Sequence, residues 1–180
     1  PDFRNKLAKM GVDGAIMASP PAFFSTQDVK LIKLGNFEDH LSWLSDADWV
    51  IEVVAEDLKI KTDLLKKIES VIMPGTIVST NTSGLSIEKI SGGLSGETRA
   101  HFMGTHFFNP PRHVELLEII PGRSTDKAVV SFMADFCEKR LGKSIVFTKD
   151  TPNFIANRIG AYALLAVMKM MVEDGYTIEE

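Results

Sequence analysis

The amino-acid sequence predicts an α/β fold with a doubly wound, mostly parallel sheet. From Asp48 onward, apolar runs of strand length alternate with segments of helical period, the pattern of a sheet that carries helices on both faces. The runs are rich in β-branched residues, as expected of strands that are buried on both sides. A chain of 180 residues can form one hydrophobic core, so we expect one domain, or one domain and part of a second.

The first half of the sheet is predicted from two apolar runs and the helices that follow them. Residues 49–54 form a short β-branched strand, and residues 58–72 form a helix that ends at a Pro-Gly pair. Residues 76–80 are the next strand, and residues 86–90 form a short helix that a Gly-Gly pair ends.

The second half is predicted from a turn with two consecutive prolines. Strands over residues 100–108 and 114–120 bracket this turn, Asn109-Pro110-Pro111. Residues 126–141 have helical spacing and stop at a glycine, and residues 143–148 form the last strand of the sheet.

The last predicted element is a long helix. Asp150 and Thr151 are N-cap candidates, and the helix runs to about Glu173. Apolar residues cover nearly every side of it over residues 159–172. We therefore expect this helix to be buried against more protein than the chain supplies.

The first residues give weaker patterns. Residues 3–10 resemble the tail of a helix, and residues 18–26 form a proline-rich loop. Residues 29–34 are predicted to form a strand, and residues 38–45 a helix.

Composition excludes several classes of protein. The net charge is −4, and Lys and Arg are scattered along the chain, so we expect no nucleic-acid partner. Cys137 is the only cysteine; helical spacing makes it a buried thiol, and a reducing compartment fits. No apolar run approaches the roughly 18 residues of a membrane span, and no signal peptide opens the chain, so we expect a soluble, cytoplasmic protein.

The first candidate group lies just beyond the strand at residues 49–54. Ligands of open α/β sheets gather at the carboxyl ends of strands, so Glu56 stands where a carboxylate could bind a ribose hydroxyl, and Lys61 could meet the same ligand. Alternatively, Glu56 is a solvated acid in the first turn of a helix and Lys61 lies on the wet face.

The second candidate group is the run STNTSGLS, residues 79–86. Its hydroxyl and amide side chains offer donors and acceptors to a polar ligand, and Gly84 allows a close backbone approach. The alternative is an ordinary turn in which Ser83 or Ser86 caps the next helix.

The third candidate group is His106 with Glu118, supported by Asn109. The histidine and the acid lie on two neighbouring strands joined by a turn, so an imidazole can meet a carboxylate that fixes its tautomer and stabilises its cation. This is the arrangement of a general base, although a hydrogen-bonded core histidine has the same pattern. A shared metal site is not expected, because His101 and His106 would face opposite sides of a strand.

The fourth candidate group is the segment DTPNFIANRIG, residues 150–160. Asn153 and Asn157 share a helix face and could present an uncharged donor to a carbonyl oxygen. Alternatively, Asn153 caps the helix and Asn157 makes a hydrogen bond between helices.

These four groups, in this order, resemble the 3-hydroxyacyl-CoA dehydrogenase family, and in particular the dehydrogenase part of long bacterial β-oxidation enzymes. The resemblance covers about residues 48–160. The segments that carry it are EVVAEDLKIK, STNTSGLSI, GTHFFNPPRHVELLEIIP and KDTPNFIANRIG.

The resemblance implies a reaction and the residues that perform it. L-3-hydroxyacyl-CoA and NAD would give 3-oxoacyl-CoA and NADH, as in the oxidation of fatty acids. His106 would be the catalytic base and Glu118 its orienting partner. Ser83 would bind the 3-oxygen of the substrate, and Asn157 would position the substrate carbonyl or the histidine.

The resemblance also implies contacts with NAD. Glu56 and Lys61 would contact the ribose on the nicotinamide side. Asn81 and Ser83 would lie near the nicotinamide, and Asn109 is included among the cofactor-binding residues.

The sequence departs from the family pattern in two ways. Gly84 stands where a second serine is frequent, and Asn153 where glycine is usual. The first β-α-β unit of a Rossmann-like domain, with its G-x-G-x-x-G turn, is missing. We therefore expect a fragment: residues 1–150 as a partial NAD-binding domain and residues 151–180 as the first helix of a helical domain.

Loss of an inner strand should leave unpaired sheet edges. We expect a homodimer, formed through these edges or through the last helix. Other readings are a non-catalytic fragment, a relative that only binds cofactor, or a dehydrogenase of another β-hydroxyacid.

Overall fold

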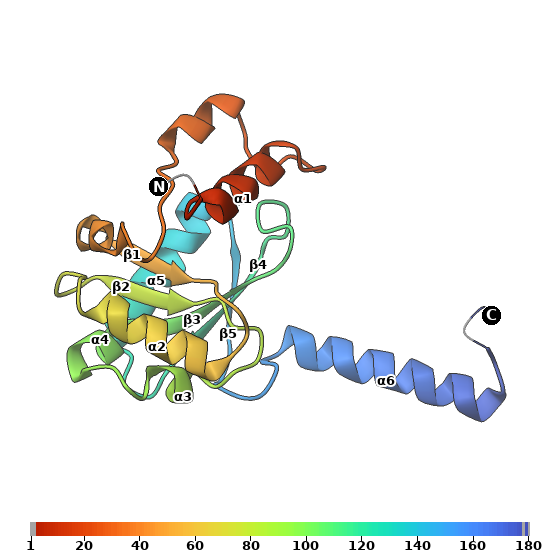
Figure 1. Cartoon of the computed structure of the whole chain (residues 1–180). Helices are drawn as coiled ribbons and strands as arrows, with labels where there is room; N and C mark the ends of the chain where they lie inside the picture. Colours follow the sequence, from red (N-terminus) through yellow and green to blue (C-terminus); the bar gives the residue numbers. More distant parts are fainter. Residues whose placement is uncertain (1–2, 178, 180) are drawn as a thin grey trace.

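The computed structural model describes residues 3–177 and 179, and its centre is one five-stranded sheet (Figure 1). The strands stand in the order β1-β2-β3-β4-β5, and all neighbours are parallel except β3 and β4, which form an antiparallel hairpin. The predicted α/β fold with a Rossmann-like sheet is confirmed. The strands are β1 Trp49–Glu52, β2 Ile77–Thr80, β3 Phe102–Phe107, β4 Leu116–Pro121 and β5 Ser144–Phe147.

Helices cover both faces of the sheet (Figure 1). The helices α2 (Leu58–Glu69), α3 (Ile87–Ser91) and α4 (Gly96–Ala100) pack on one face, and α5 (Lys127–Leu141) packs on the other. Each face has its own apolar core, because β2 and β3 alternate their side chains between the two sides. The helix α4 was not predicted from the sequence.

The helix α5 brings Cys137 into the core beneath β4, where its side chain is fully buried. Burial raises the pKa of this thiol to about 11, and the charge of Lys143 only partly opposes the effect. The thiol is therefore a structural group, as its helical spacing predicted.

The strand predicted at residues 29–34 is wrong. Residues Thr26–Leu31 form a 3-10 helix, η1, and the chain continues as an unpaired extended segment. An isolated apolar run needs a neighbouring edge before it can become a strand. The next strand along the chain, β1, pairs only with β2 within the described part of the chain.

The remaining N-terminal elements lie outside the sheet and precede β1 in the chain (Figure 1). The helix α1 spans Lys6–Ile16, beyond the predicted tail at residues 3–10, and a 3-10 helix, η2 (Leu41–Asp46), replaces the helix predicted at residues 38–45. Arg112, on the β3–β4 hairpin, donates to the carbonyls of Pro21 and Phe23. The hairpin thereby holds the proline-rich loop in place.

The last helix, α6 (Ala156–Asp174), begins later than the sequence predicted. Asp150 does not cap it; its carboxylate instead accepts hydrogen bonds from the Ser86 hydroxyl and from the N–H groups of Ile87 and Glu88, at the start of α3. The chain then passes through two residues with positive φ before it becomes helical. The predicted N-cap therefore belongs to a different helix.

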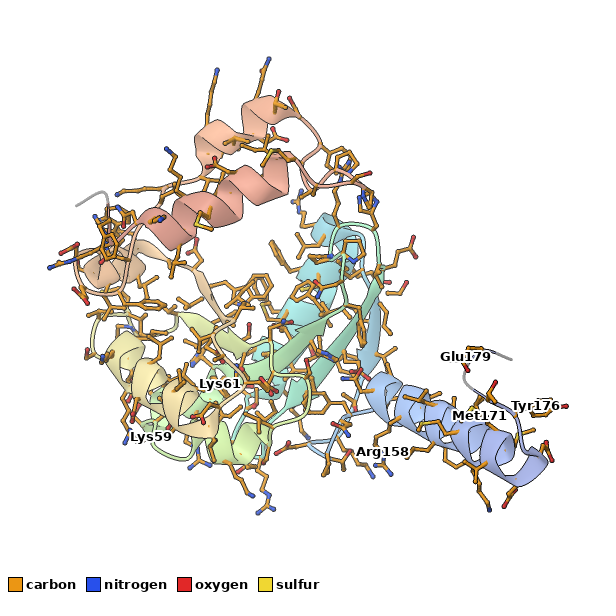
Figure 2. The ribbon with its side chains drawn as sticks, turned by 45° about the vertical axis from the view of Figure 1, so that its right-hand side comes forward. Lys59, Lys61, Arg158, Met171, Tyr176 and Glu179 are labelled. Atoms are coloured by element: carbon orange, nitrogen blue, oxygen red, sulfur yellow. The ribbon has the colours of Figure 1, made fainter. Side chains whose placement is uncertain are left out.

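The helix α6 extends away from the sheet, and its side chains point outward on all sides (Figure 2). None of its residues is buried. The exposed apolar residues include Ile159, Tyr162, Leu164, Leu165, Val167, Met168, Met170 and Val172. None of the helices that the structure describes is long and apolar enough to span a membrane.

Candidate active site

The hairpin of β3 and β4 places His106 directly opposite Glu118. Nδ1 of His106 and Oε2 of Glu118 are 2.8 Å apart, and both residues are almost fully buried, at 3% and 1% exposure. A buried carboxylate at this distance holds the proton on Nδ1 and leaves Nε2 free to accept another. The pairing predicted from the sequence is therefore present, in the geometry of a histidine general base.

The other oxygen of Glu118 is held by the start of α6. Oε1 accepts hydrogen bonds from the N–H groups of Ile155 and Ala156, at 3.0 and 2.9 Å. Two N–H groups that the helix cannot satisfy internally are thus satisfied by the acid that orients the histidine. The first turn of α6 and the position of the dyad are therefore coupled.

Aromatic rings surround the imidazole of His106. The ring of Phe108 lies 4.4 Å from it and the ring of Phe154 lies 5.7 Å from it, centroid to centroid. Phe154 is itself buried in the core next to α2 and α3. The surrounding apolar groups exclude water and strengthen the interaction of His106 with Glu118.

The turn after β2 brings Ser83 to the same end of the sheet. The carbonyl of Ser83 accepts a hydrogen bond of 3.1 Å from the side chain of Asn157 on α6, and the Ser83 side chain is exposed. Asn157 directly follows the residues whose N–H groups bind Glu118, so the start of α6 connects Ser83 to the dyad. The Ser83 hydroxyl and the Asn157 amide are uncharged partners for an oxygen atom of a ligand.

Glu56 joins the two turns that follow β1 and β2. Its Oε1 accepts a hydrogen bond from the Thr82 hydroxyl and one of 2.9 Å from the Ser83 N–H, while Oε2 lies 3.3 Å from Nζ of Lys61. Burial opposes ionisation, but the hydrogen bonds from Thr82 and Ser83 and the charge of Lys61 outweigh it and lower the pKa of Glu56. Glu56 is therefore an anion at the end of the sheet.

Lys61 points from α2 toward the sheet, whereas Lys59 of the same helix points away (Figure 2). Only 1% of Lys61 is exposed, and its ammonium group donates to both oxygens of Glu52 and to the carbonyl of Val54. The ammonium group is thus surrounded by acceptors of the protein, and its link to the surface runs through Glu56.

Glu52 is a site residue that was missed at the level of the sequence. It is 2% exposed and accepts hydrogen bonds from Thr80 at 2.6 Å and from the Val54 N–H at 2.6 Å, in addition to Lys61. An acid inside the apolar run WVIEVV must have a partner when the strand is buried, and this signal could have identified it. Glu52 ties the ends of β1 and β2 to α2.

The two other candidate cofactor contacts differ in their surroundings. Oδ1 of Asn81 accepts a 2.9 Å hydrogen bond from the Phe107 N–H, so this side chain joins β2 to the hairpin. Asn109 lies in the exposed turn of the hairpin.

The other histidines of the region lie apart from His106. His101 is outside β3, as the C-cap of α4, and His113 contacts the carbonyl of Pro21. Within residues 3–177 and 179, no group of three or more His, Cys, Asp or Glu side chains is arranged to hold a metal ion.

The residues at the end of the sheet fit one half of a dinucleotide. An anionic carboxylate at Glu56 suits a ribose hydroxyl, and the exposed Ser83 donates its backbone N–H to this carboxylate. No G-x-G-x-x-G turn occurs in the sequence, so the described residues supply no cradle of this kind for a pyrophosphate.

Comparison with known proteins decides the family. The family model described as "3-hydroxyacyl-CoA dehydrogenase, NAD binding domain" matches residues 7–151. The chain belongs to the 3-hydroxyacyl-CoA dehydrogenase family. The resemblance seen in the sequence is confirmed, and so is NAD as the cofactor, because the family model that matches is that of the NAD-binding domain.

Relatives and solved structures agree with this family. A probable 3-hydroxyacyl-CoA dehydrogenase of Deinococcus radiodurans is 44% identical over 98% of this chain and 51% of its own length. A protein of Bacillus subtilis with the same description is 43% identical over 99% of this chain and 23% of its own length. The crystal structure of (S)-3-hydroxybutyryl-CoA dehydrogenase from Ralstonia eutropha has a TM-score of 0.81, at 25% identity, over 99% of this chain and 63% of that one. This chain thus spans about a quarter to a half of the first two relatives.

Proposed function

We propose that the protein oxidises L-3-hydroxyacyl-CoA to 3-oxoacyl-CoA with NAD, in the β-oxidation of fatty acids. One observation carries the proposal: His106 and Glu118 form a buried pair beside Ser83 and Asn157, at the end of a sheet whose family binds NAD. A relative described as a putative fatty acid oxidation complex trifunctional enzyme, from Rickettsia felis, is 37% identical over 96% of this chain and supports the metabolic role.

Each residue of the site has a role in the proposal that follows from its surroundings. His106 takes the proton of the 3-hydroxyl group through Nε2, and Glu118 stabilises the imidazolium that results. Ser83 donates to the 3-oxygen, and Asn157 holds the turn that carries Ser83. NAD, when bound, would supply the acceptor for the hydride that leaves C3 of the substrate.

The cofactor contacts proposed from the sequence divide into direct and indirect ones. Glu56 binds a ribose hydroxyl on the nicotinamide side. Lys61 acts through Glu56, since its ammonium group is buried. Asn81 holds the end of β2 against the hairpin and so forms one side of the nicotinamide site. Asn109 contacts the cofactor from the turn of the hairpin.

We also propose a division of the chain into a part of the NAD-binding domain, residues 1–150, and the first helix of a helical domain, residues 151–180. The family model ends at residue 151, and α6 has no buried residue. Its exposed apolar side chains support association with a second helical layer or with a second subunit.

The proposal is tested on the full-length protein. Oxidation of NADH is followed with acetoacetyl-CoA and, in parallel, with free acetoacetate and with NADPH. We expect turnover with acetoacetyl-CoA and NADH. The rate with free acetoacetate, and the rate with NADPH in place of NADH, should be at most a small fraction of this rate. Equal rates with free acetoacetate would contradict the CoA substrate, and absence of turnover in every arm would refute the dehydrogenase function.

A further inference from the structure

The turn after β2 and the linker before α6 meet at Gly84 and Asn153. A Cβ atom built on Gly84 would lie 2.6 Å from Oδ1 of Asn153, well inside van der Waals contact. The backbone N and Cα of Asn153 would lie at the ordinary distances of 3.4 and 3.6 Å. Only the side chain of Asn153 therefore fills the space above Gly84. Because the φ of Gly84 is not positive, this glycine matters through the space that it leaves for the Asn153 side chain and not through its backbone conformation.

Asn153 has a backbone conformation that would suit glycine better. Its φ is +61°, in the left-handed region that L residues other than Asn and Asp rarely adopt. A side chain at such a position costs free energy that glycine would not, so its presence points to a use for the amide.

The amide of Asn153 is free to serve a ligand. The residue is exposed, and no hydrogen bond to its side chain occurs within residues 3–177 and 179. Two residues next to Asn153 connect it to the site. Gly84, which its side chain contacts, follows Ser83, and Phe154, the next residue in the chain, packs against His106. Asn157, on α6, already donates to the carbonyl of Ser83. The prediction that Asn153 and Asn157 share a helix face is wrong, because Asn153 has a positive φ and precedes the first residue of α6.

We propose that Asn153 is a further substrate-binding residue. Its side-chain amide, which occupies the space over Gly84, contacts the oxygen-bearing end of the acyl group beside Ser83. An amide offers both a donor and an acceptor, so it fits a hydroxyl and the carbonyl that replaces it. The inference rests on the proposed function, because it takes the 3-hydroxyacyl substrate from there.

The test compares Gly84→Ala, Asn153→Gly and the double variant of the whole protein. The added methyl group must push the Asn153 amide aside, and Asn153→Gly removes it, so each change should raise KM for acetoacetyl-CoA about fivefold to tenfold, the loss of one hydrogen bond. Since both changes remove the same contact, the double variant should show the same increase and not the product of two increases. KM for NADH should stay unchanged.

Thermal unfolding separates this inference from the proposed function. Gly84→Ala should lower the midpoint of unfolding, and adding Asn153→Gly should restore it, because the space then becomes available. A wild-type KM in Asn153→Gly, or increases that multiply in the double variant, would overturn the role of Asn153. An inactive wild-type protein would instead refute the proposed function, and the substrate contact with it, while the unfolding data would still report the contact of Gly84 with Asn153.

Discussion

At the scale of single residues, the site depends on charged groups that are held from more than one side. Glu118 accepts from His106 with one oxygen and from the first N–H groups of α6 with the other. Glu56 is held by Thr82, Ser83 and Lys61. Carboxylates bound in this way have a fixed orientation before any ligand arrives, and such preorganisation favours catalysis.

The lowered pKa of Glu56 predicts a specific dependence of stability on pH. The ordinary value of this carboxyl group is 4.5, and the folded value lies below it. Its contribution to stability is therefore complete above the ordinary value and is lost as the pH falls through the folded value. We expect the free energy of unfolding of the wild type to exceed that of Glu56→Gln at about pH 6, and the difference to shrink as the pH falls below the ordinary pKa of the carboxyl group.

Urea unfolding at a series of pH values measures this difference. Glu115→Gln is the matched control, because Glu115 is an exposed acid on the β3–β4 hairpin. A difference between wild type and Glu56→Gln that grows as the pH falls would contradict the assignment.

At the scale of elements, the strands and long helices could be predicted from the sequence, because their apolar periods are set by local chain geometry. The dyad could be predicted as well, since a hairpin turn places residues on neighbouring strands opposite one another. The capping partners could not, because Asp150 caps α3 and Glu118 caps α6 across the fold. The prediction of a strand at residues 29–34 was wrong for a similar reason. Whether an apolar segment forms a strand depends on a neighbouring strand with which it can pair, and not on its own residues alone.

The two departures from the family pattern are connected in a way that the sequence did not reveal. Gly84 and Asn153 are far apart in the chain, and each alone is a minor substitution. In the structure the asparagine side chain occupies the space over the glycine, so the two residues form one packing unit.

The buried ion pair of α2 with β1 predicts a large effect on stability. Lys61→Met would leave the carboxylate of Glu52 buried without its cation. We expect a loss of about 3–5 kcal/mol in the free energy of unfolding, as for other buried pairs from which one partner is removed. Lys59→Met on the same helix removes an exposed pair with Asp63 and should change stability little. Equal effects of the two substitutions in urea unfolding would contradict the buried network.

Substitution of glycine by alanine should have opposite effects on stability at two positions. Gly142 ends α5 with a φ of +64°, and Gly11 lies inside α1; at both, the position that a Cβ atom would take has no neighbouring group within 4 Å. Gly142→Ala should therefore destabilise the protein by about 1 kcal/mol, because alanine is strained in the left-handed region. Gly11→Ala should stabilise α1 by about 0.5–1 kcal/mol. Thermal unfolding midpoints that move in the same direction for both variants would contradict the assigned backbone conformations.

At the scale of the whole molecule, the sheet positions the chemistry and the surrounding elements close around it. The ends of β1 and β2 carry the groups that fit a cofactor, while the β3–β4 hairpin carries the base. The helix α6 is joined to this centre by Glu118 and by Asn157, and otherwise extends from it without a buried residue (Figure 1). A ligand between the sheet and α6 would therefore contact both parts.

The role of His106 as the catalytic base is tested by the rate at which the His106→Gln variant of the full-length protein oxidises NADH with acetoacetyl-CoA. His101→Gln is the control, because His101 lies outside the site at the end of α4. We expect kcat to fall by about 10²–10⁴-fold in His106→Gln, the usual contribution of a general acid or base, and to stay at the wild-type value in His101→Gln. Wild-type activity in His106→Gln would contradict the account.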